Sequence, residues 1–208
     1  MTLDDIQAAA ANAGLQTMGA LNEDGKTIVL FGTGPAFWAA FSTSPEFLDG
    51  EKHPVDRWSK RIVGYLAQTF DGTCQFPSDG PPYPPFIRWA LDSGQFFQSP
   101  VGMMVHPEVG LMISLRGALI LPTEIPMPQQ DTQSPCLTCD ALCTTACPVD
   151  ALSAESGYSV ADCHTFLDTR DGSDCMSRGC IARRACPHSS KAERADAQSA
   201  LHMRSFHP

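Results

Sequence analysis

Hydrophobic and polar positions near the amino terminus follow first a helical and then a strand period. Thr2 followed by Asp5 predicts a helix start, and Gly14 predicts its end. Apolar residues in 15–21 and 27–31 predict two strands that pair across a short polar turn. The chain therefore begins as a helix followed by a β-hairpin.

Helical periodicity returns further along the chain. We expect one helix to begin near Ala36 and a longer amphipathic helix to span 54–70. A third, short helix is expected over 86–93, and Gly94 ends it. The intervening segment 71–85 is rich in proline and glycine and is predicted to be irregular. The apolar stripe of the long helix consists of Val55, Trp58, Ile62, Leu66 and Phe70.

Two more strands precede the cysteine-rich part of the chain. They are expected over 101–105 and 111–121, the second with a bulge at Gly117. A proline-rich and then polar segment follows and has the composition of a linker. At 208 residues the chain has room for a medium domain and a small appendage, which predicts an α+β domain over 1–130 and a cysteine module over 131–208.

Eight of the nine cysteines lie in that module, and four occur as Cys136-x2-Cys139-x3-Cys143-x3-Cys147-Pro148. Such spacing lets one loop place three thiolates around a compact cluster, and it is similar to the two-cluster bacterial ferredoxin pattern. In that pattern the cysteine before proline ligates the other cluster. Two [4Fe–4S] clusters with crossed ligands are predicted, the first held by Cys136, Cys139, Cys143 and Cys186 and the second by Cys147, Cys163, Cys175 and Cys180.

The spacing departs from the ferredoxin pattern, and other uses of cysteine remain open. The gap between Cys139 and Cys143 holds one residue too many, and the later cysteines are irregularly spaced. Zinc also accepts four thiolates, although zinc motifs typically come as separated pairs. Disulfides are the other alternative, but the acidic start of the chain does not resemble a signal peptide, and we expect a cytoplasmic protein with reduced thiols.

Net charge limits the partners. A value of −9 argues against nucleic acid and anionic membranes, and no apolar run is long enough to span a bilayer. Half of the lysines and arginines nevertheless follow residue 169, among them Arg178, Arg183 and Arg184. They form either a basic collar around anionic clusters or a solvated helix face.

The block 102–122 resembles the core of CblC-type cobalamin-processing proteins. It contains a His-Pro before a glycine, and then a strand of the form Arg-Gly-x-x-x-Leu-Pro. The resemblance spans roughly 27–128 and implies a nitroreductase-like sheet-and-helix domain that binds cobalamin. The residues that would contact the corrinoid are Gly102, His106, Gly110, Arg116 and Gly117.

A domain of this type joined to a ferredoxin-like module resembles epoxyqueuosine reductases and corrinoid-dependent reductive dehalogenases. That resemblance implies that an external donor reduces the clusters and that the clusters reduce a bound corrinoid. Pro82 stands where the epoxyqueuosine reductases have their proton-donating Asp, and proline cannot supply an acid. No catalytic residue is assigned.

Three hypotheses follow. The first is an iron–sulfur protein that passes electrons to a corrinoid or similar ligand, as a corrinoid-linked reductase would. The second is a ferredoxin-like electron carrier whose first domain is a docking platform without a catalytic centre. The third is a zinc-stabilised interaction protein.

Overall fold

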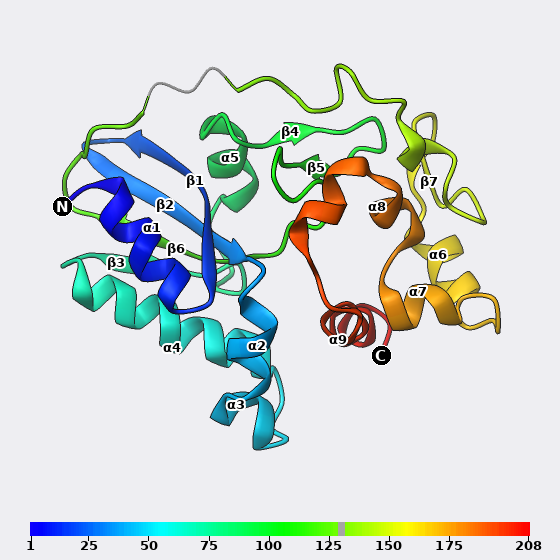
Figure 1. Cartoon of the computed structure of the whole chain (residues 1–208), viewed down its shortest axis with the longest axis horizontal. Helices are drawn as coiled ribbons and strands as arrows, with labels where there is room; N and C mark the ends of the chain where they lie inside the picture. Colours follow the sequence, from blue (N-terminus) through cyan, green and yellow to red (C-terminus); the bar gives the residue numbers. More distant parts are fainter. Residues whose placement is uncertain (129–131) are drawn as a thin grey trace. The chain divides into compact units, whose positions relative to one another are not determined.

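The computed structural model describes residues 1–128 and 132–208, which form two compact units (Figure 1). Unit 1 comprises Met1–Phe96 and Ser114–Thr132, and unit 2 comprises Phe97–Ile113 and Gln133–Pro208. The predicted α+β class is confirmed. The observed boundary after Thr132 lies close to the predicted one, but the segment Phe97–Ile113, which we expected in the first domain, belongs to unit 2.

Unit 1 is built on a four-stranded antiparallel sheet. Its strand order is β1-β2-β6-β3, and helices α1, α4 and α5 pack against its strands (Figure 1). The strands are β1 (Leu15–Glu23), β2 (Lys26–Thr33), β3 (Thr73–Gln75) and β6 (Leu115–Leu121), and the helices are α1 (Leu3–Asn12), α2 (Phe37–Ser42), α3 (Pro45–Leu48), α4 (Pro54–Thr69) and α5 (Phe86–Asp92).

The first helix and hairpin form as predicted. Thr2 and Asp5 make a reciprocal capping box, because Asp5 accepts a hydrogen bond from the Thr2 amide at 2.8 Å and donates its own amide to the Thr2 hydroxyl. The hairpin turns at Asp24 and Gly25, which both have positive φ angles, the conformation that a tight two-residue hairpin requires.

The long amphipathic helix α4 is confirmed, but its buried face is rotated from the predicted one. Trp58 and Leu66 are buried as expected, whereas Val55, Ile62 and Phe70 are only partly buried. Val63 is fully buried in their place. Neighbouring aromatic rings set this orientation, since the Trp58 ring packs edge-on against Phe37 and Phe41 of α2.

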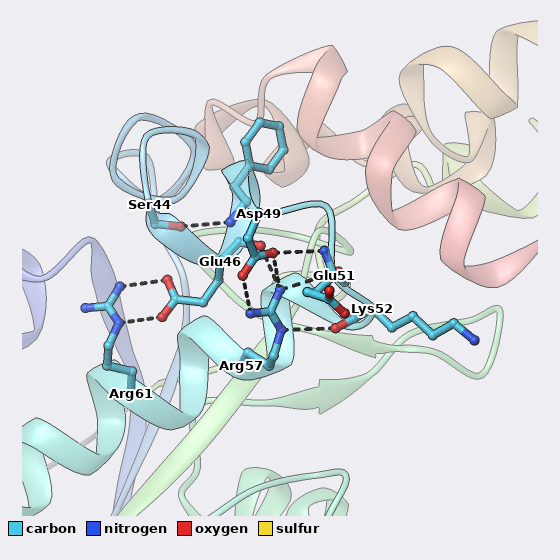
Figure 2. Close-up of polar contacts among 8 residues, drawn as sticks. Ser44, Glu46, Asp49, Glu51, Lys52, Arg57 and Arg61 are labelled. Atoms are coloured by element: carbon cyan, nitrogen blue, oxygen red, sulfur yellow. Dashed lines mark hydrogen bonds and ion pairs between the residues drawn. The ribbon is translucent and has the colours of Figure 1, made fainter.

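Two arginines of α4 bind the preceding helix α3 and the loop that connects α3 to α4 (Figure 2). Arg61 makes a bidentate pair with Glu46, at 2.5 and 2.9 Å. Arg57 donates a hydrogen bond to each carboxylate oxygen of Asp49, both at 2.7 Å. It also donates to the backbone carbonyls of Glu46 and Lys52. These contacts hold the pKa of Glu46 at about 2, chiefly through the hydrogen bonds from Arg61.

The sheet differs from the sequence expectation at two places. The irregular segment 71–85 contains a short strand, β3, that pairs with β6. The strand expected over 111–121 begins only at Leu115, and its bulge lies at Arg116, next to the predicted Gly117. The residues Leu111–Ile113 belong to unit 2, where the carbonyls of Leu111 and Ile113 accept hydrogen bonds from Arg183 and that of Met112 accepts one from Arg194.

Unit 2 consists of short elements around the cysteines. The strand expected over 101–105 is reduced to β5 (Met104–Val105), which pairs with β4 (Phe97–Gln98). A second small pair is β7 (Leu152–Ser153) with β8 (Gly157–Tyr158). The helices are η1 (Leu142–Thr144), α6 (Val160–Leu167), α7 (Ser173–Arg178), α8 (Ile181–Ala185), η2 (Pro187–Ala192) and α9 (Asp196–Phe206), of which η1 and η2 are 3₁₀ helices. Within the described ranges, no helix has the length and apolarity needed to cross a bilayer.

Candidate metal centres

Four cysteines of unit 2 surround one cavity at the start of the module. Cys136, Cys139 and Cys143 come from the loop that includes η1, and Cys186 comes from the end of α8. The non-atom space there is about 290 Å³, counting the part open to solvent. These four cysteines are the set predicted for the first cluster.

The other four cysteines surround a second cavity. Cys147 follows η1, Cys163 lies in α6, Cys175 lies in α7, and Cys180 precedes α8. The non-atom space is about 370 Å³ on the same basis. The rest of the wall is almost entirely apolar and is formed by Pro148, Val149, Ala151, Leu152, Tyr158, Phe166, Leu167, Ile181, Ala182 and Met203. An apolar wall limits solvent access and thereby influences the potential of a redox centre.

A short apolar core in unit 2 contacts cysteines of both sets. Leu111, Leu152 and Ala182 are buried in it, with Cys143 and Cys186 of the first set. Cys136 of the first set and Cys147 and Cys180 of the second pack against the same core. The two cavities therefore share a hydrophobic wall, and the chain passes from one to the other through α8.

The thiols are spread too widely for one metal ion. No three His, Cys, Asp or Glu side chains among residues 1–128 and 132–208 are close enough to hold a single ion. A zinc ion binds each of four thiolates at about 2.3 Å, which demands a tight tetrahedron. A [4Fe–4S] cluster also takes four thiolates, but each binds a different iron, so the thiolates stand further apart. Each cavity therefore has the number of thiol donors that a [4Fe–4S] cluster takes.

Burial controls the protonation of these thiols. It raises the pKa of Cys136 and Cys143 in the first set and of Cys163 and Cys175 in the second. Neighbouring thiols of the same set raise these pKa values further. Metal binding requires thiolates, so loading either cavity would release protons. The described cysteines are all free, and none forms a disulfide.

The lining of each cavity also includes a residue with a hydroxyl group. The buried Ser99 Oγ, at the first cavity, has no hydrogen-bond partner among the described residues. At the second, the Tyr158 side chain lowers the pKa of the Cys163 thiol, against the larger effect of burial. Buried polar groups normally find partners, so an unpartnered hydroxyl beside four thiols is consistent with a cluster sulfur as acceptor. No sequence pattern marks Ser99 or Tyr158.

The residues predicted to contact a corrinoid fall in both units. Gly102, His106 and Gly110 belong to unit 2, whereas Arg116 and Gly117 belong to unit 1. His106 is buried, accepts a hydrogen bond from the Glu108 amide at 3.2 Å, and its backbone pairs with Gly110. Gly110 lies directly against the backbone of Ser189. His106 and Gly110 thus close a tight turn that packs beside the segment following Cys186, whereas Gly102 lies in a separate turn that begins at Ser99.

Arg116 lines a separate cavity within unit 1. Its non-atom space is about 530 Å³ on the basis used for the two cysteine cavities, of which about 260 Å³ is room for the centres of water-sized spheres, and it is formed by Asp56, Ser59, Phe76, Pro77, Ser78 and Arg116. Arg116 lies 3.4 Å from Asp56 and donates to the Leu115 carbonyl, and burial lowers the pKa of its guanidinium. Gly117 packs tightly against Phe76 and Val63. The space open to a water-sized sphere is below the range of drug-sized ligand sites, so the cavity is too small to enclose a whole corrin ring.

Comparisons with known proteins give a distant structural likeness. No protein-family model matches the chain, and no curated protein matches it in sequence. A similar solved structure is the crystal structure of a C. elegans B12-trafficking protein, CblC, described as a homologue of human MMACHC. It shares 12% identity and a TM-score of 0.49, and the match covers 99% of this chain and 96% of that chain. A likeness at this level carries no argument about ligand or activity.

Proposed function

We propose that this protein is an iron–sulfur redox protein with two [4Fe–4S] clusters. The first would be held by Cys136, Cys139, Cys143 and Cys186, and the second by Cys147, Cys163, Cys175 and Cys180. The supporting observation is that the eight cysteines separate into two cavities with the memberships that the crossed ferredoxin pattern predicts. Clusters of this kind accept and release single electrons.

The protein side chains would bind the clusters and shield them. The thiols must lose their protons on loading, and the apolar core of Leu111, Leu152 and Ala182 would keep water away from both sites. Ser99 and Tyr158 supply one hydroxyl to each cavity. An external one-electron donor is part of this proposal.

The acceptor proposed first is a corrinoid. Support for it comes from the resemblance of 102–122 to CblC-type proteins, not from the Arg116 cavity, which is too small for a corrin. The alternative is an electron carrier whose first unit is a docking platform. Adding cobalamin to the anaerobic protein separates the two proposals: a change in the cobalamin spectrum on binding supports the first, and an unchanged spectrum supports the carrier.

Cofactor analysis of anaerobically purified protein tests the proposed clusters directly. We expect a brown protein with near-equal iron and acid-labile sulfide. Cys139→Ser should lose about half of both, because it removes a ligand from one set of two, whereas Cys74→Ser in strand β3 of unit 1 should lose none. A colourless protein that holds zinc without sulfide would instead support the zinc-stabilised interaction protein.

A further inference from the structure

Ser99 lies in the turn that joins β4 to β5 in unit 2. Its amide donates to the Met103 carbonyl at 2.8 Å, and its carbonyl accepts from the Gly102 amide at 3.0 Å. Gly102 has the positive φ angle with which this turn closes. Both backbone hydrogen-bonding groups of Ser99 are therefore used within the hairpin, and they fix the position from which its side chain projects.

This hairpin packs on the first cysteine set. Val101 and Val105 are buried in the apolar core of unit 2 together with Cys143 and Cys186 of that set. Ser99 itself lines the cavity that the four cysteines of the first set surround. The described residues that line the second cavity do not include Ser99. A hydroxyl from outside the cysteine-rich sequence thus belongs to the first cavity alone.

The Ser99 hydroxyl is buried and has no hydrogen-bond partner among residues 1–128 and 132–208. It therefore donates to none of the thiols that share its cavity. Two other buried serines, Ser59 and Ser93, donate to backbone carbonyls three or four residues earlier. A buried hydroxyl without an acceptor costs free energy, so the surroundings of Ser99 call for an acceptor that the protein itself does not supply.

The lining of the cavity indicates which acceptor fits. Besides Ser99 and the four cysteines, the lining residues have apolar side chains: Pro100, Val105, Leu111, Ala141, Leu142 and Pro187. A water molecule in such a place needs about two to four polar partners, and these side chains offer none. The sulfurs of an iron–sulfur cluster accept hydrogen bonds, and these bonds help to set its reduction potential.

We propose that the Ser99 hydroxyl donates a hydrogen bond to sulfur at the first site and makes that site easier to reduce. This inference rests on the proposed clusters. Reduction adds one electron to the site, and the negative charge on its sulfurs increases. A hydrogen bond to an acceptor becomes stronger as the acceptor becomes more negative, so the bond from Ser99 favours the reduced state.

Redox titration of the anaerobic protein, followed by the electron paramagnetic resonance of the reduced sites, tests the role of Ser99. In Ser99→Ala the equilibrium constant for reduction of the first site should fall about fivefold, which is about 40 mV because about 59 mV corresponds to a tenfold change. The second site should keep its potential. Ser99→Thr retains a hydroxyl and should restore most of the first-site potential. Ser190→Ala is the matched control, because the Ser190 hydroxyl already donates to the Pro187 carbonyl at 3.0 Å.

Single-site variants assign each potential to its cavity. In Cys163→Ser, which should retain only the first site, the effect of Ser99→Ala should persist. In Cys139→Ser, which should retain only the second, the effect should vanish. Electron–nuclear double resonance of the reduced first site, in water and in deuterium oxide, should show one exchangeable proton that is lost in Ser99→Ala and kept in Ser190→Ala. A change in packing alone would not remove that proton.

The outcomes separate the role of Ser99 from the proposed clusters. A first-site potential that is unchanged in Ser99→Ala, or that moves together with the second, overturns the role of Ser99 and leaves the clusters in place. If Ser99→Ala does not retain the first cluster, Ser99→Thr decides: a retained cluster supports the hydroxyl, and an equal loss shows that Ser99 contributes only by packing. Protein without iron and sulfide would refute the clusters themselves, and this inference with them.

Discussion

Cys180 and Cys186 flank the same short helix, α8, but line different cavities. Five residues separate them, and at about 1.5 Å of helical rise per residue the two thiol-bearing positions are roughly 9 Å apart along the helix axis. A short helix therefore separates the two cavities at this point of the chain. Cys147 and Cys186 each line the cavity of the other sequence run, so neither set of four cysteines is contiguous in sequence.

Paired substitutions distinguish the crossed arrangement from a sequential one. Cys139→Ser combined with Cys186→Ser removes two ligands of the first set and should leave about half of the iron, because the second set is intact. Cys139→Ser combined with Cys180→Ser removes one ligand from each set and should abolish both clusters. Iron and sulfide analysis of the two double variants makes the comparison, and a sequential arrangement would give equal losses in the two proteins.

The two cavities group the cysteines as the sequence did, whereas the surroundings of the cysteines were not predicted. A short loop limits how far Cys136, Cys139 and Cys143 can lie apart, so their grouping follows from their spacing, and their role as cluster ligands stays a prediction. In unit 2, the segment 97–113 accepts hydrogen bonds from arginine side chains at its backbone carbonyls. Every residue has a backbone carbonyl, so the sequence does not show which ones accept such bonds. The contacts of Arg183 were open for the same reason: only the tertiary structure shows that it donates to the carbonyls of Leu111 and Ile113 and does not lie on a solvated helix face.

In unit 1, too, local features were predicted from the sequence and features that depend on distant residues were not. The capping box of Thr2 and Asp5 and the hairpin turn at Asp24 are local features, and they were predicted from a few neighbouring residues. Strand β3 was missed because it is three residues long, within a proline-rich segment, and is defined by pairing with the distant strand β6. The buried face of α4 depended on aromatic partners from α2, which the periodicity of α4 alone does not contain.

Substitution of Gly110 should destabilise unit 2 strongly. Gly110 has a φ of +56°, and a Cβ added there would lie 2.4 Å from the Ser189 amide nitrogen. Backbone strain at positive φ costs about 1–2 kcal/mol, and the clash with backbone adds to it, so Gly110→Ala should lower the free energy of unfolding by at least about 2 kcal/mol. The Ser189 amide donates to the Cys186 carbonyl, so iron in the first set should fall as well. Urea unfolding and iron analysis measure the two effects.

Gly102 provides the control for that substitution. It also has a positive φ, +76°, but an added Cβ would meet no atom within 4 Å. Gly102→Ala should therefore cost only the backbone strain, about 1 kcal/mol, and leave the iron content unchanged. Equal losses in the two variants would show that contact with Ser189 has no part in the effect.

The ion pair of Glu46 and Arg61 should stabilise unit 1 in a pH-dependent way. The pKa of Glu46 falls from 4.5 to about 2 in the folded protein, so its contribution is present above pH 4.5 and is lost as pH falls from there toward 2. Because Arg61 is half exposed, we expect Glu46→Gln to cost about 1–2 kcal/mol at pH 7 rather than the full value that the shift implies. Denaturant unfolding of both proteins at several pH values should show the difference narrowing below pH 4.5.

A double-mutant cycle checks the origin of that stability. Glu46→Gln and Arg61→Gln should together cost less than the sum of the two single substitutions, because each single change already removes the same bidentate pair. Additive costs at pH 7 would mean that the two side chains contribute independently and that the pH dependence has another source.

Removal of the clusters should unfold unit 2 and spare the sheet of unit 1. The elements of unit 2 are short and gather around the two cavities, so ligation of the clusters would supply much of its folding free energy. Unit 1 has its own buried core, in which Val29, Leu30 and Leu119 are inaccessible to solvent. Hydrogen exchange after oxidative loss of iron should therefore show faster exchange at the amides of Leu111 and Ser189 and unchanged protection at those of Val29 and Leu119. Retained protection at Leu111 and Ser189 would mean that unit 2 folds without metal and that its thiols keep their positions without a bound cluster.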